Sequence, residues 1–246
     1  MANLAGRCAL VTGGSRGMGA AVAVALARDG ADVAFTYRAS PDRAASVLAM
    51  IEQHGRQGLA IEADSASPEA ITRAVTQTVE VLGKIDILVN NAAIGFPGPF
   101  AHLELDEFQA MMDVNVRAPV LFAQAVIPHM PSGGRILSVG SALAERVPFA
   151  GVTAYAMTKS ALLAFTRSLS RELGPEGITV NMLLPGSVDT DMNPATSESG
   201  NYQRSLTALG RFGEPQEIAD IVAFFVSPAA SLITGAIITA DGGMNA

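Results

Sequence analysis

The sequence is short of cysteine and of long apolar runs, and each shortage narrows the class of protein. The chain has 246 residues and a single cysteine, Cys8, so no disulfide can form within it, which favours a reducing compartment. Charged or polar residues interrupt every apolar run before it reaches the roughly 20 residues of a membrane-spanning helix. The first residues lack a charged-then-apolar signal pattern. We therefore expect a cytoplasmic protein with no membrane partner.

Positive charge is also scarce. Lys and Arg number 16 against 23 Asp and Glu, a formal net charge of −7, which repels phosphate backbones and makes a nucleic-acid partner unexpected. The three histidines, His54, His102 and His129, are scattered without ligand-like spacing, so we expect no metal site. Hydrophobic residues make up 49% of the chain and charged residues 16%. This composition excludes intrinsic disorder.

Short β-branched and apolar runs alternate with longer stretches of helical period. The runs are residues 8–12, 33–36, 59–62, 85–89, 135–139, 178–184 and 236–240, and helical stretches include 20–28, 68–82 and 154–173. Strands alternating with helices predict βαβ units in a seven-stranded, doubly wound parallel sheet with helices on both faces. No linker divides the chain, so residues 1–246 are expected to form one α/β domain.

Residues that typically begin or end helices support these boundaries. Ser67 before Pro68 predicts a helix N-cap, and Gly30, Gly55, Gly83 and Gly174 follow helical stretches as expected C-terminal stops. Residues 187–213 are the least regular segment. A loop of that length within a compact domain indicates a mobile substrate flap.

A glycine-rich segment, Thr12 to Gly19, directly follows the first predicted strand and precedes a helix. Glycines allow a close approach to a pyrophosphate, which the free N–H groups and partial positive charge of a helix N-terminus attract. The expected cofactor-binding residues here are Gly13, Ser15, Arg16, Gly17, Met18 and Gly19. A turn without a ligand is the alternative, but the position in the first βα unit favours dinucleotide binding.

The end of the second predicted strand indicates which dinucleotide binds. An acidic residue there would hold a ribose 2′-hydroxyl, but this strand ends in Tyr37 and Arg38. Arg38 and Arg16 would suit a 2′-phosphate, so NADP(H) is favoured over NAD(H), unless both arginines are ordinary surface charges. Asp64 and Ser65 follow the third strand, where Asp64 would contact the adenine edge or serve as a cap.

Tyr155 and Lys159 lie four residues apart at the start of a predicted helix and therefore share one helix face. A nearby ammonium stabilises a phenolate, so we expect Lys159 to lower the pKa of Tyr155 toward working pH. Such a phenol would exchange a proton with a carbonyl or alcohol oxygen. In isolation, this spacing is common by chance and is better explained as one face of an amphipathic helix.

The Tyr155–Lys159 pair is one of several motifs that follow one another along the chain in the order of a known family. Together with the Thr12–Gly19 loop, residues 90–93 (Asn-Asn-Ala-Ala), Asn115, Ser141, Pro185-Gly186 and the C-terminal residues 241–243, the chain resembles the short-chain dehydrogenase/reductase family over nearly its whole length. The resemblance implies a Rossmann fold and a homotetramer. It also implies hydride transfer between NADP(H) and a small-molecule ketone or secondary alcohol.

The resemblance further implies a role for each matching position. Tyr155 would be the catalytic acid/base, Lys159 would bind the nicotinamide ribose, Ser141 would hydrogen-bond the substrate oxygen, and Asn115 would hold a relay water. Asn91, Ala92 and Ala93 would line the cofactor groove, and Pro185, Gly186, Val188 and Thr190 would surround the nicotinamide.

Two positions depart from the family pattern. Ala93 stands where the family often has glycine, and Ser141 lies 155 − 141 = 14 residues before Tyr155, one more than the commonest spacing. The intervening loop must therefore bulge. Ser138 is the rival serine, but it falls within the predicted strand.

The sequence indicates the substrate less closely than the cofactor. Phe96, Phe149 and Met192 are expected at the mouth of the substrate site, which suits a small or medium apolar ketone. Two alternatives remain: a 3-oxoacyl-[acyl-carrier-protein] reductase and a non-catalytic NADP(H)-binding sensor. Segments 128–132 and 174–176 lack Lys and Arg, which disfavours an acidic carrier protein.

Overall fold

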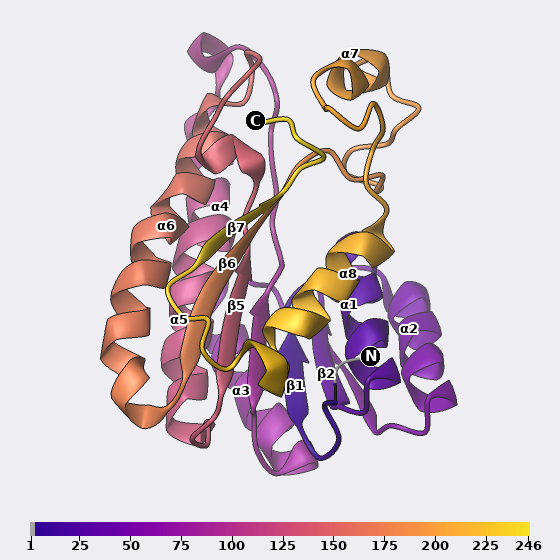
Figure 1. Ribbon diagram of the computed structural model, residues 1–246, viewed down its shortest axis with the longest axis vertical. Helices are drawn as coiled ribbons and strands as arrows, with labels where there is room; N and C mark the ends of the chain where they lie inside the picture. Colours follow the sequence, from indigo (N-terminus) through magenta and orange to yellow (C-terminus); the bar gives the residue numbers. More distant parts are fainter. Residues whose placement is uncertain (1–2) are drawn as a thin grey trace.

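The computed structural model describes residues 3–246 and contains one seven-stranded parallel sheet (Figure 1). The strand order is β3-β2-β1-β4-β5-β6-β7, so the order reverses between β1 and β4. This reversal confirms the doubly wound α/β fold expected from the sequence. Ligands of such sheets bind outside the carboxyl ends of the strands, where the order reverses.

The strands match the predicted runs to within two residues at either end. They are β1 (Cys8–Val11), β2 (Asp32–Tyr37), β3 (Gly58–Glu62), β4 (Ile87–Asn90), β5 (Arg135–Val139), β6 (Thr179–Pro185) and β7 (Ile237–Ala240). The α-helices are α1 (Gly17–Arg28), α2 (Pro41–Gln53), α3 (Pro68–Leu82), α4 (Leu105–Met112), α5 (Ala118–Val126), α6 (Thr153–Leu173), α7 (Gly200–Ser205) and α8 (Pro215–Phe225). A π-helical turn, Asp113–Arg117, joins α4 to α5.

The ends of α3 are fixed by the residues that the sequence singles out. The Ser67 hydroxyl accepts a hydrogen bond from the Ala70 N–H at 3.1 Å, and Gly83 ends the helix in the left-handed conformation with φ 83°. The expectation for Gly174 is wrong in detail. It stays helical at φ −53° and opens a 3₁₀ turn, and the left-handed residue is Gly177, with φ 75°.

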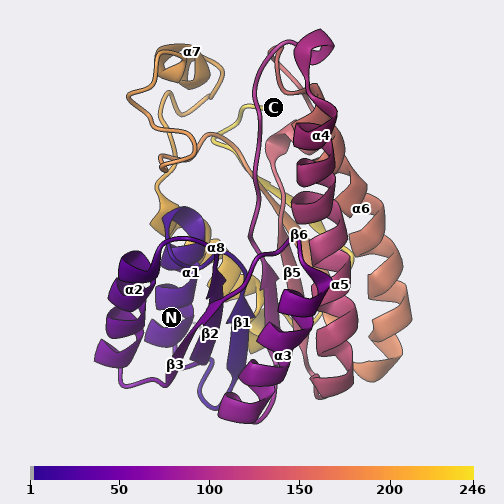
Figure 2. The same ribbon diagram turned by 180° about the vertical axis from the view of Figure 1, so that it is seen from behind.

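Each face of the sheet has its own helical layer (Figures 1 and 2). Helices α1, α2 and α8 pack on one face, in a core that includes Leu26, Phe35 and Val222. Helices α3, α5 and α6 cover the other, around Leu88, Phe122 and Val180. Because both faces are covered, the central strands β1, β4, β5 and β6 are buried at every position.

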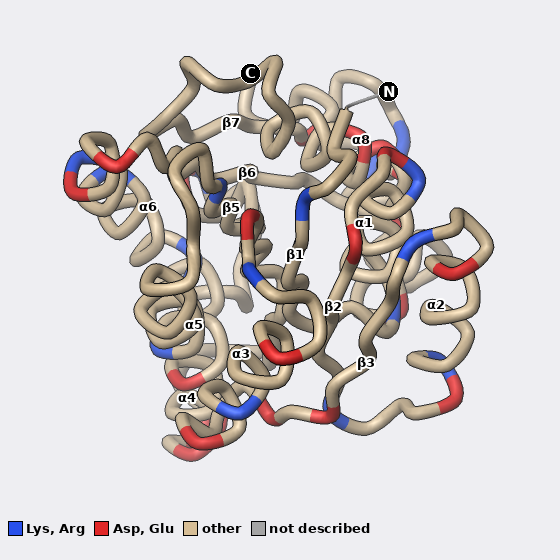
Figure 3. The backbone as a smooth tube through the Cα atoms, turned by 90° about the horizontal axis from the view of Figure 1, so that it is seen from below, with Lys and Arg blue, Asp and Glu red and all other residues tan. Residues whose placement is uncertain are grey.

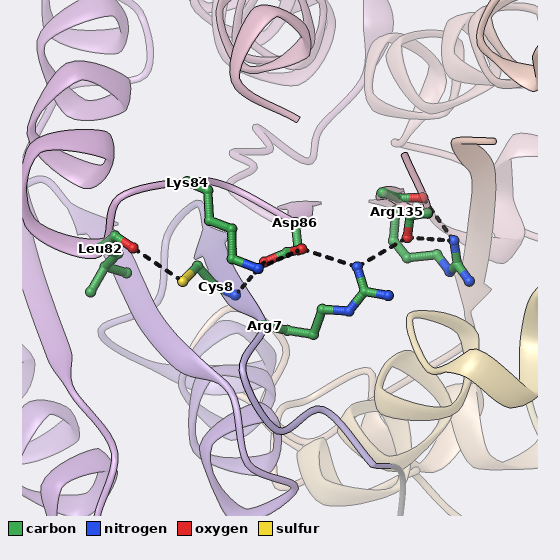
Figure 4. Close-up of polar contacts among 8 residues, drawn as sticks. Arg7, Cys8, Leu82, Lys84, Asp86 and Arg135 are labelled. Atoms are coloured by element: carbon green, nitrogen blue, oxygen red, sulfur yellow. Dashed lines mark hydrogen bonds and ion pairs between the residues drawn. The ribbon is translucent and has the colours of Figure 1, made fainter. Parts of the chain in front are cut away.

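The amino ends of β1, β4 and β5 are joined by a polar network around Asp86 (Figure 4). Asp86 is 1% exposed, accepts from the Cys8 N–H at 2.9 Å, and pairs with Arg7 and Lys84 at 3.0 Å each. Arg7 and the buried Arg135 both donate to the carbonyl of Gly133. The network lies at the end of the sheet opposite the switch point.

The helical segment Leu105–His129, which combines α4, the π turn and α5, corrects one expectation. It is long and apolar enough by composition to cross a membrane, although the sequence was expected to contain no such segment. Several of its apolar residues, including Phe122 and Val126, belong to the core on the sheet face covered by α3. The segment is therefore explained as a core helix.

Charged residues of both signs are interspersed over the helices and loops seen from below in Figure 3. This distribution agrees with a fold whose central strands carry apolar side chains on both faces.

Candidate active site

The glycine-rich loop lies between β1 and α1 and is held from both sides by hydrogen bonds. The Thr12 hydroxyl accepts from the N–H groups of Asn91 and Ala92 at 2.9 Å each, and the Asn91 amide donates to the carbonyls of Thr12 and Gly13. On the other side, the Gly13 N–H donates to the Thr36 hydroxyl at 3.1 Å. The asparagine expected to line a cofactor groove therefore also fixes the loop beside it.

Two glycines of this loop have no room for a side chain. A Cβ on Gly19 would lie 2.2 Å from the Gly13 carbonyl oxygen and 2.4 Å from the Asn91 amide nitrogen, and one on Gly14 would lie 2.5 Å from Phe35. Within residues 3–246, no side chain caps the N-terminus of α1 behind the loop. These glycines therefore allow the loop to pack closely against Phe35 and Asn91, and the N-terminus of α1 beside it offers the N–H groups that receive a pyrophosphate.

A cleft of about 440 Å³ runs along the carboxyl edge of the sheet from this loop to α6. Of the residues expected to bind cofactor or substrate, those lining it are Gly13, Ser15, Arg16, Gly17, Met18, Gly19, Tyr37, Arg38, Asp64, Ser65, Asn91, Ala92, Ala93, Tyr155, Lys159, Thr190 and Met192. Residues from both halves of the chain, far apart in sequence, therefore share one cleft.

At the β2 and β3 end of the cleft, Arg16 and Arg38 supply positive charge. Asp64 lies on the same wall, and its carboxylate accepts from the Ala66 N–H at 2.8 Å. That bond is the local capping role that the sequence left as an alternative. An acidic residue at the end of β2 is replaced by Tyr37, as the sequence indicates.

Tyr155 and Lys159 line the opposite end of the cleft, at the carboxyl ends of β4 and β5, whereas Ser141 does not line the cleft. Lys159 lies one turn after Tyr155 on α6, and its Nζ is 5.7 Å from the centre of the Tyr155 ring. Ser141, just beyond β5, lies close enough to Tyr155 to lower its pKa, and the Ser141 hydroxyl accepts a hydrogen bond from the Leu143 N–H at 3.2 Å. Ser138 lies inside β5 and is 1% exposed, so the bulged loop brings Ser141, not Ser138, to the tyrosine.

The pKa values at this end differ from the expectation that Lys159 would lower that of Tyr155. Burial raises the pKa of Tyr155 to about 12, opposed by the neighbouring Ser141, and burial lowers the pKa of Lys159 to about 8. The expected direction is therefore wrong for this structure, because desolvation of the phenol outweighs other influences. Tyr155 remains a protonated phenol at neutral pH, which suits a proton donor.

Lys159 and Asn115 are held by the backbone around them. The Lys159 Nζ donates to the Val139 carbonyl at 3.1 Å. The Asn115 amide, in the π turn, accepts from the Ile94 N–H and donates to the Ile94 carbonyl and the Thr158 hydroxyl, at 2.8–3.1 Å. Asn115 is 1% exposed and does not line the cleft. Its side chain joins the loop after β4 to α6.

Three residues expected around the nicotinamide support the cleft rather than line it. The Gly186 N–H donates to the Ala240 carbonyl, and a Cβ at Gly186 would lie 2.7 Å from the Asp241 Cα. Val188 is 5% exposed and bridges to Gly213, and Pro185 ends β6. Together they direct the chain so that Thr190 reaches the cleft.

The expected substrate contacts are only partly brought together. Met192 lines the cleft and is 54% exposed, whereas Phe96 and Phe149 do not line it. The Phe149 ring packs edge to face against Tyr202 of α7, with 6.4 Å between centroids. Segment 187–213 thus reaches across to the loop before α6, and α7 stands beyond the carboxyl edge of the sheet (Figures 1 and 2).

Several lining residues were missed by the sequence analysis, namely Thr36, Ala39, Ser40, Ala63, Ile94, Val114, Val139, Gly140 and Asp191. Most contribute backbone or small apolar surface, which carries no chemical signal in a sequence. Gly95 was also missed, although a Cβ there would lie 3.2 Å from the Tyr155 ring. Its place next to the Asn-Asn-Ala-Ala motif is the signal that could have indicated it.

Comparison with known proteins places this geometry in a family. The family model described as Enoyl-(Acyl carrier protein) reductase matches residues 13–245. A relative from Escherichia coli K12, named cyclic-di-GMP-binding biofilm dispersal mediator protein, is 42% identical over 246 residues, which cover all of both chains.

Two solved structures are similar over nearly their full length. A short-chain dehydrogenase from Burkholderia cenocepacia J2315, in complex with NADP, has a TM-score of 0.98 and 52% identity over 99% of this chain and 100% of that one. A blue fluorescent protein from a metagenomic library, in complex with NADPH, has a TM-score of 0.97 and 48% identity, with the same coverage. By fold, motifs and these matches, the chain belongs to the short-chain dehydrogenase/reductase family.

Proposed function

We propose that this protein is an NADP(H)-dependent oxidoreductase that transfers hydride reversibly between the nicotinamide and a ketone or secondary alcohol. The observation that carries the proposal is one cleft with two chemically distinct ends. Glycine backbone and two arginines line one end, and Tyr155 and Lys159 line the other, with Ser141 beside the tyrosine.

The cleft fits a phosphorylated dinucleotide. The glycines present backbone without side chains to the cleft, the α1 N-terminus attracts a pyrophosphate, and Arg16 and Arg38 suit a 2′-phosphate. NADP and NADPH are also the cofactors of the two solved relatives. When bound, the cofactor supplies or accepts the hydride.

The chain itself positions the substrate and moves the proton. In ketone reduction, Tyr155 would donate its phenolic proton to the carbonyl oxygen, and Ser141 would hydrogen-bond that oxygen. Lys159, held by the Val139 carbonyl, would place its positive charge beside the phenolate that remains.

The substrate class proposed is a small or medium apolar ketone. Exposed Met192 lies at the cleft, and Phe96 is 39% exposed on the loop after β4. The description of the matching family keeps a carrier-protein thioester as the alternative substrate. A comparison of 3-oxoacyl thioesters on pantetheine and on acyl carrier protein with simple ketones would separate the two.

The test is a ketone and diketone panel with NADPH and with NADH, followed by the nicotinamide absorbance, for the wild type and Tyr155→Phe. The wild type should oxidise NADPH with at least one ketone. The variant should bind NADPH as tightly and turn over roughly 10²–10⁴-fold more slowly. Equal rates for the two proteins would remove Tyr155 from the reaction.

A non-catalytic binding role is the second candidate, and it is favoured by the name of the Escherichia coli relative, a cyclic-di-GMP-binding mediator. In the same assay, this role predicts NADPH binding without oxidation on any substrate. Titration with cyclic di-GMP would then identify the second ligand. Because Tyr155, Ser141 and Lys159 are all present and close together, the catalytic role is the main proposal.

A further inference from the structure

Asp191 reaches across the cleft from segment 187–213 to two arginines on other elements. Its Oδ2 is in close contact with Nη1 of Arg43, in the first turn of α2, and lies 3.9 Å from Nη1 of Arg16, the N-cap residue of α1. Two guanidinium groups from separate elements therefore converge on one carboxylate oxygen. Asp191 and Arg16 line the cleft, and Arg43 approaches the carboxylate from outside the lining.

This contact is not needed for the fold. The two arginine side chains are 56% exposed and that of Asp191 is 49% exposed, and ion pairs at such exposure add little to stability. Arg43 and Arg16 together hold the pKa of Asp191 below its usual range, so the carboxylate is charged at neutral pH. The site is thus a pair of cations that is already occupied by an internal anion.

The same position suits a phosphate. Paired guanidinium groups are a preferred partner of phosphate oxygens, and Arg38 and Ser40 line the adjacent wall of the cleft. A 2′-phosphate carries more negative charge than a carboxylate. NAD(H), with a neutral hydroxyl in its place, offers nothing to displace the carboxylate.

We propose that Asp191 is a cofactor-specificity residue whose carboxylate competes with the 2′-phosphate of NADP(H) for Arg16 and Arg43. This inference rests on the proposed function, because it concerns the same cleft. When the phosphorylated cofactor binds, both guanidinium groups turn from the carboxylate to the phosphate. Asp191 thereby lowers the affinity for NADP(H) without affecting that for NAD(H).

The test measures binding alone, by calorimetric titration of the wild type, Asp191→Asn and Arg43→Gln. The probes are NADPH, NADH, adenosine 2′,5′-bisphosphate and AMP. Glu198→Gln is the matched control, because it removes one exposed carboxylate from the same segment. Competition predicts opposite effects: D191N should bind both 2′-phosphate ligands about three- to tenfold more tightly, and R43Q should bind them more weakly. NADH and AMP should bind all four proteins alike.

If the ion pair only holds segment 187–213 in place, D191N and R43Q should change the affinities in the same direction, because either variant breaks the same contact. Equal effects of D191N and R43Q, equal effects on NADPH and NADH, or no effect of D191N would each overturn the proposal. If the wild type bound no NADPH at all, the proposed function itself would fail. That result is distinguishable from the others because it involves no variant.

Discussion

Lys159 combines a functional position with an unfavourable environment. Its side chain is 3% exposed and its hydrogen-bond acceptor is the neutral carbonyl of Val139, so burial lowers its pKa from 10.5 to about 8. The unfolded chain therefore binds this proton more tightly than the folded chain at pH values between about 8 and 10.5. Stability should rise with pH through this window. Above about pH 10, Tyr155 opposes the rise, since its raised pKa makes the folded phenol harder to ionise.

Lys159→Met should therefore stabilise the protein while abolishing its activity. At pH 7 the variant no longer buries an ammonium, and we expect its free energy of unfolding to increase by about 1–3 kcal/mol. Denaturant unfolding at pH 7 and pH 10 measures the effect, which should shrink at the higher pH. Arg171→Met, which removes an exposed cation from the same helix, is the control and should change stability by less than about 0.5 kcal/mol. A destabilised K159M would contradict the account.

The surroundings of Tyr155 show which features of the site can be read from single residues of the sequence and which cannot. Ser141 could be chosen over Ser138 because a residue inside a buried strand cannot turn toward a cleft, and the structure places Ser141 at the tyrosine. The direction of the Tyr155 pKa shift could not be predicted. Charge proximity is visible in a spacing of four residues, whereas the extent of desolvation depends on every segment packed around the phenol.

At the scale of elements, the glycine loop and α1 are joined by contacts that leave no space at Gly19. Gly19→Ala would bring a methyl group within 2.2 Å of the Gly13 carbonyl and 2.4 Å of the Asn91 amide. We expect NADPH affinity to fall at least about tenfold while the rest of the fold persists. Fluorescence titration with NADPH measures the effect.

Gly174→Ala is the matched control for that substitution. Gly174 has helical dihedral angles, and no atom of residues 3–246 outside its own helical turn lies within 4 Å of the position that a Cβ would take there. Alanine should therefore leave binding unchanged and stability equal or slightly higher. If G19A bound NADPH like the wild type, the loop would have more freedom than its contacts imply.

The Asp86 network joins three strands at the edge of the sheet away from the cleft, which separates stability from catalysis. Asp86→Asn removes the carboxylate shared by Arg7, Lys84 and the Cys8 N–H, so we expect a loss of about 2–4 kcal/mol in unfolding free energy. Below its unfolding midpoint the variant should keep the wild-type kcat and KM. Lys84→Gln, which removes a partner that is 44% exposed, should cost less than about 1 kcal/mol. A larger loss in K84Q than in D86N would contradict this ranking.

Element boundaries were predictable where chemistry marks them. Ser67 and Gly83 specify both ends of α3, and the seven apolar runs fix the strands because buried parallel strands are apolar on both faces. The helix α1 begins at Gly17, three residues before the predicted Ala20. This start could not be predicted because the helix begins inside the glycine loop. The short α7 has no apolar period to indicate it.

At the scale of the whole molecule, segment 187–213 connects two regions on either side of the cleft. Asp191 reaches the arginines beside the glycine loop, and Tyr202 packs on Phe149 near the start of α6. The sequence predicted a mobile substrate flap from the irregularity of this stretch, but not which residues it contacts. Its contacts depend on residues more than 50 positions away, which no local pattern encodes. We propose that it acts as the substrate flap.

Tyr202→Ala should loosen this segment. Loss of the edge-to-face contact, worth about 0.5–1.5 kcal/mol, should speed amide hydrogen exchange in α7 by roughly two- to tenfold without changing exchange in β5 or β6. Tyr202→Phe keeps the ring and loses only a hydrogen bond of 3.4 Å to the Pro148 carbonyl, so it should exchange like the wild type. Equal acceleration in both variants would point to the hydroxyl instead.

The solitary thiol of Cys8 gives this chain a practical advantage. Burial, with Asp86 nearby, raises the pKa of Cys8, and the side chain is 5% exposed in β1. Thiolates are the species that react with alkylating and spin-label reagents, so Cys8 should react slowly with these reagents in the folded protein. A cysteine introduced at exposed Asn201 would then take up a label selectively, and movement beside the cleft could be followed spectroscopically with the native core intact.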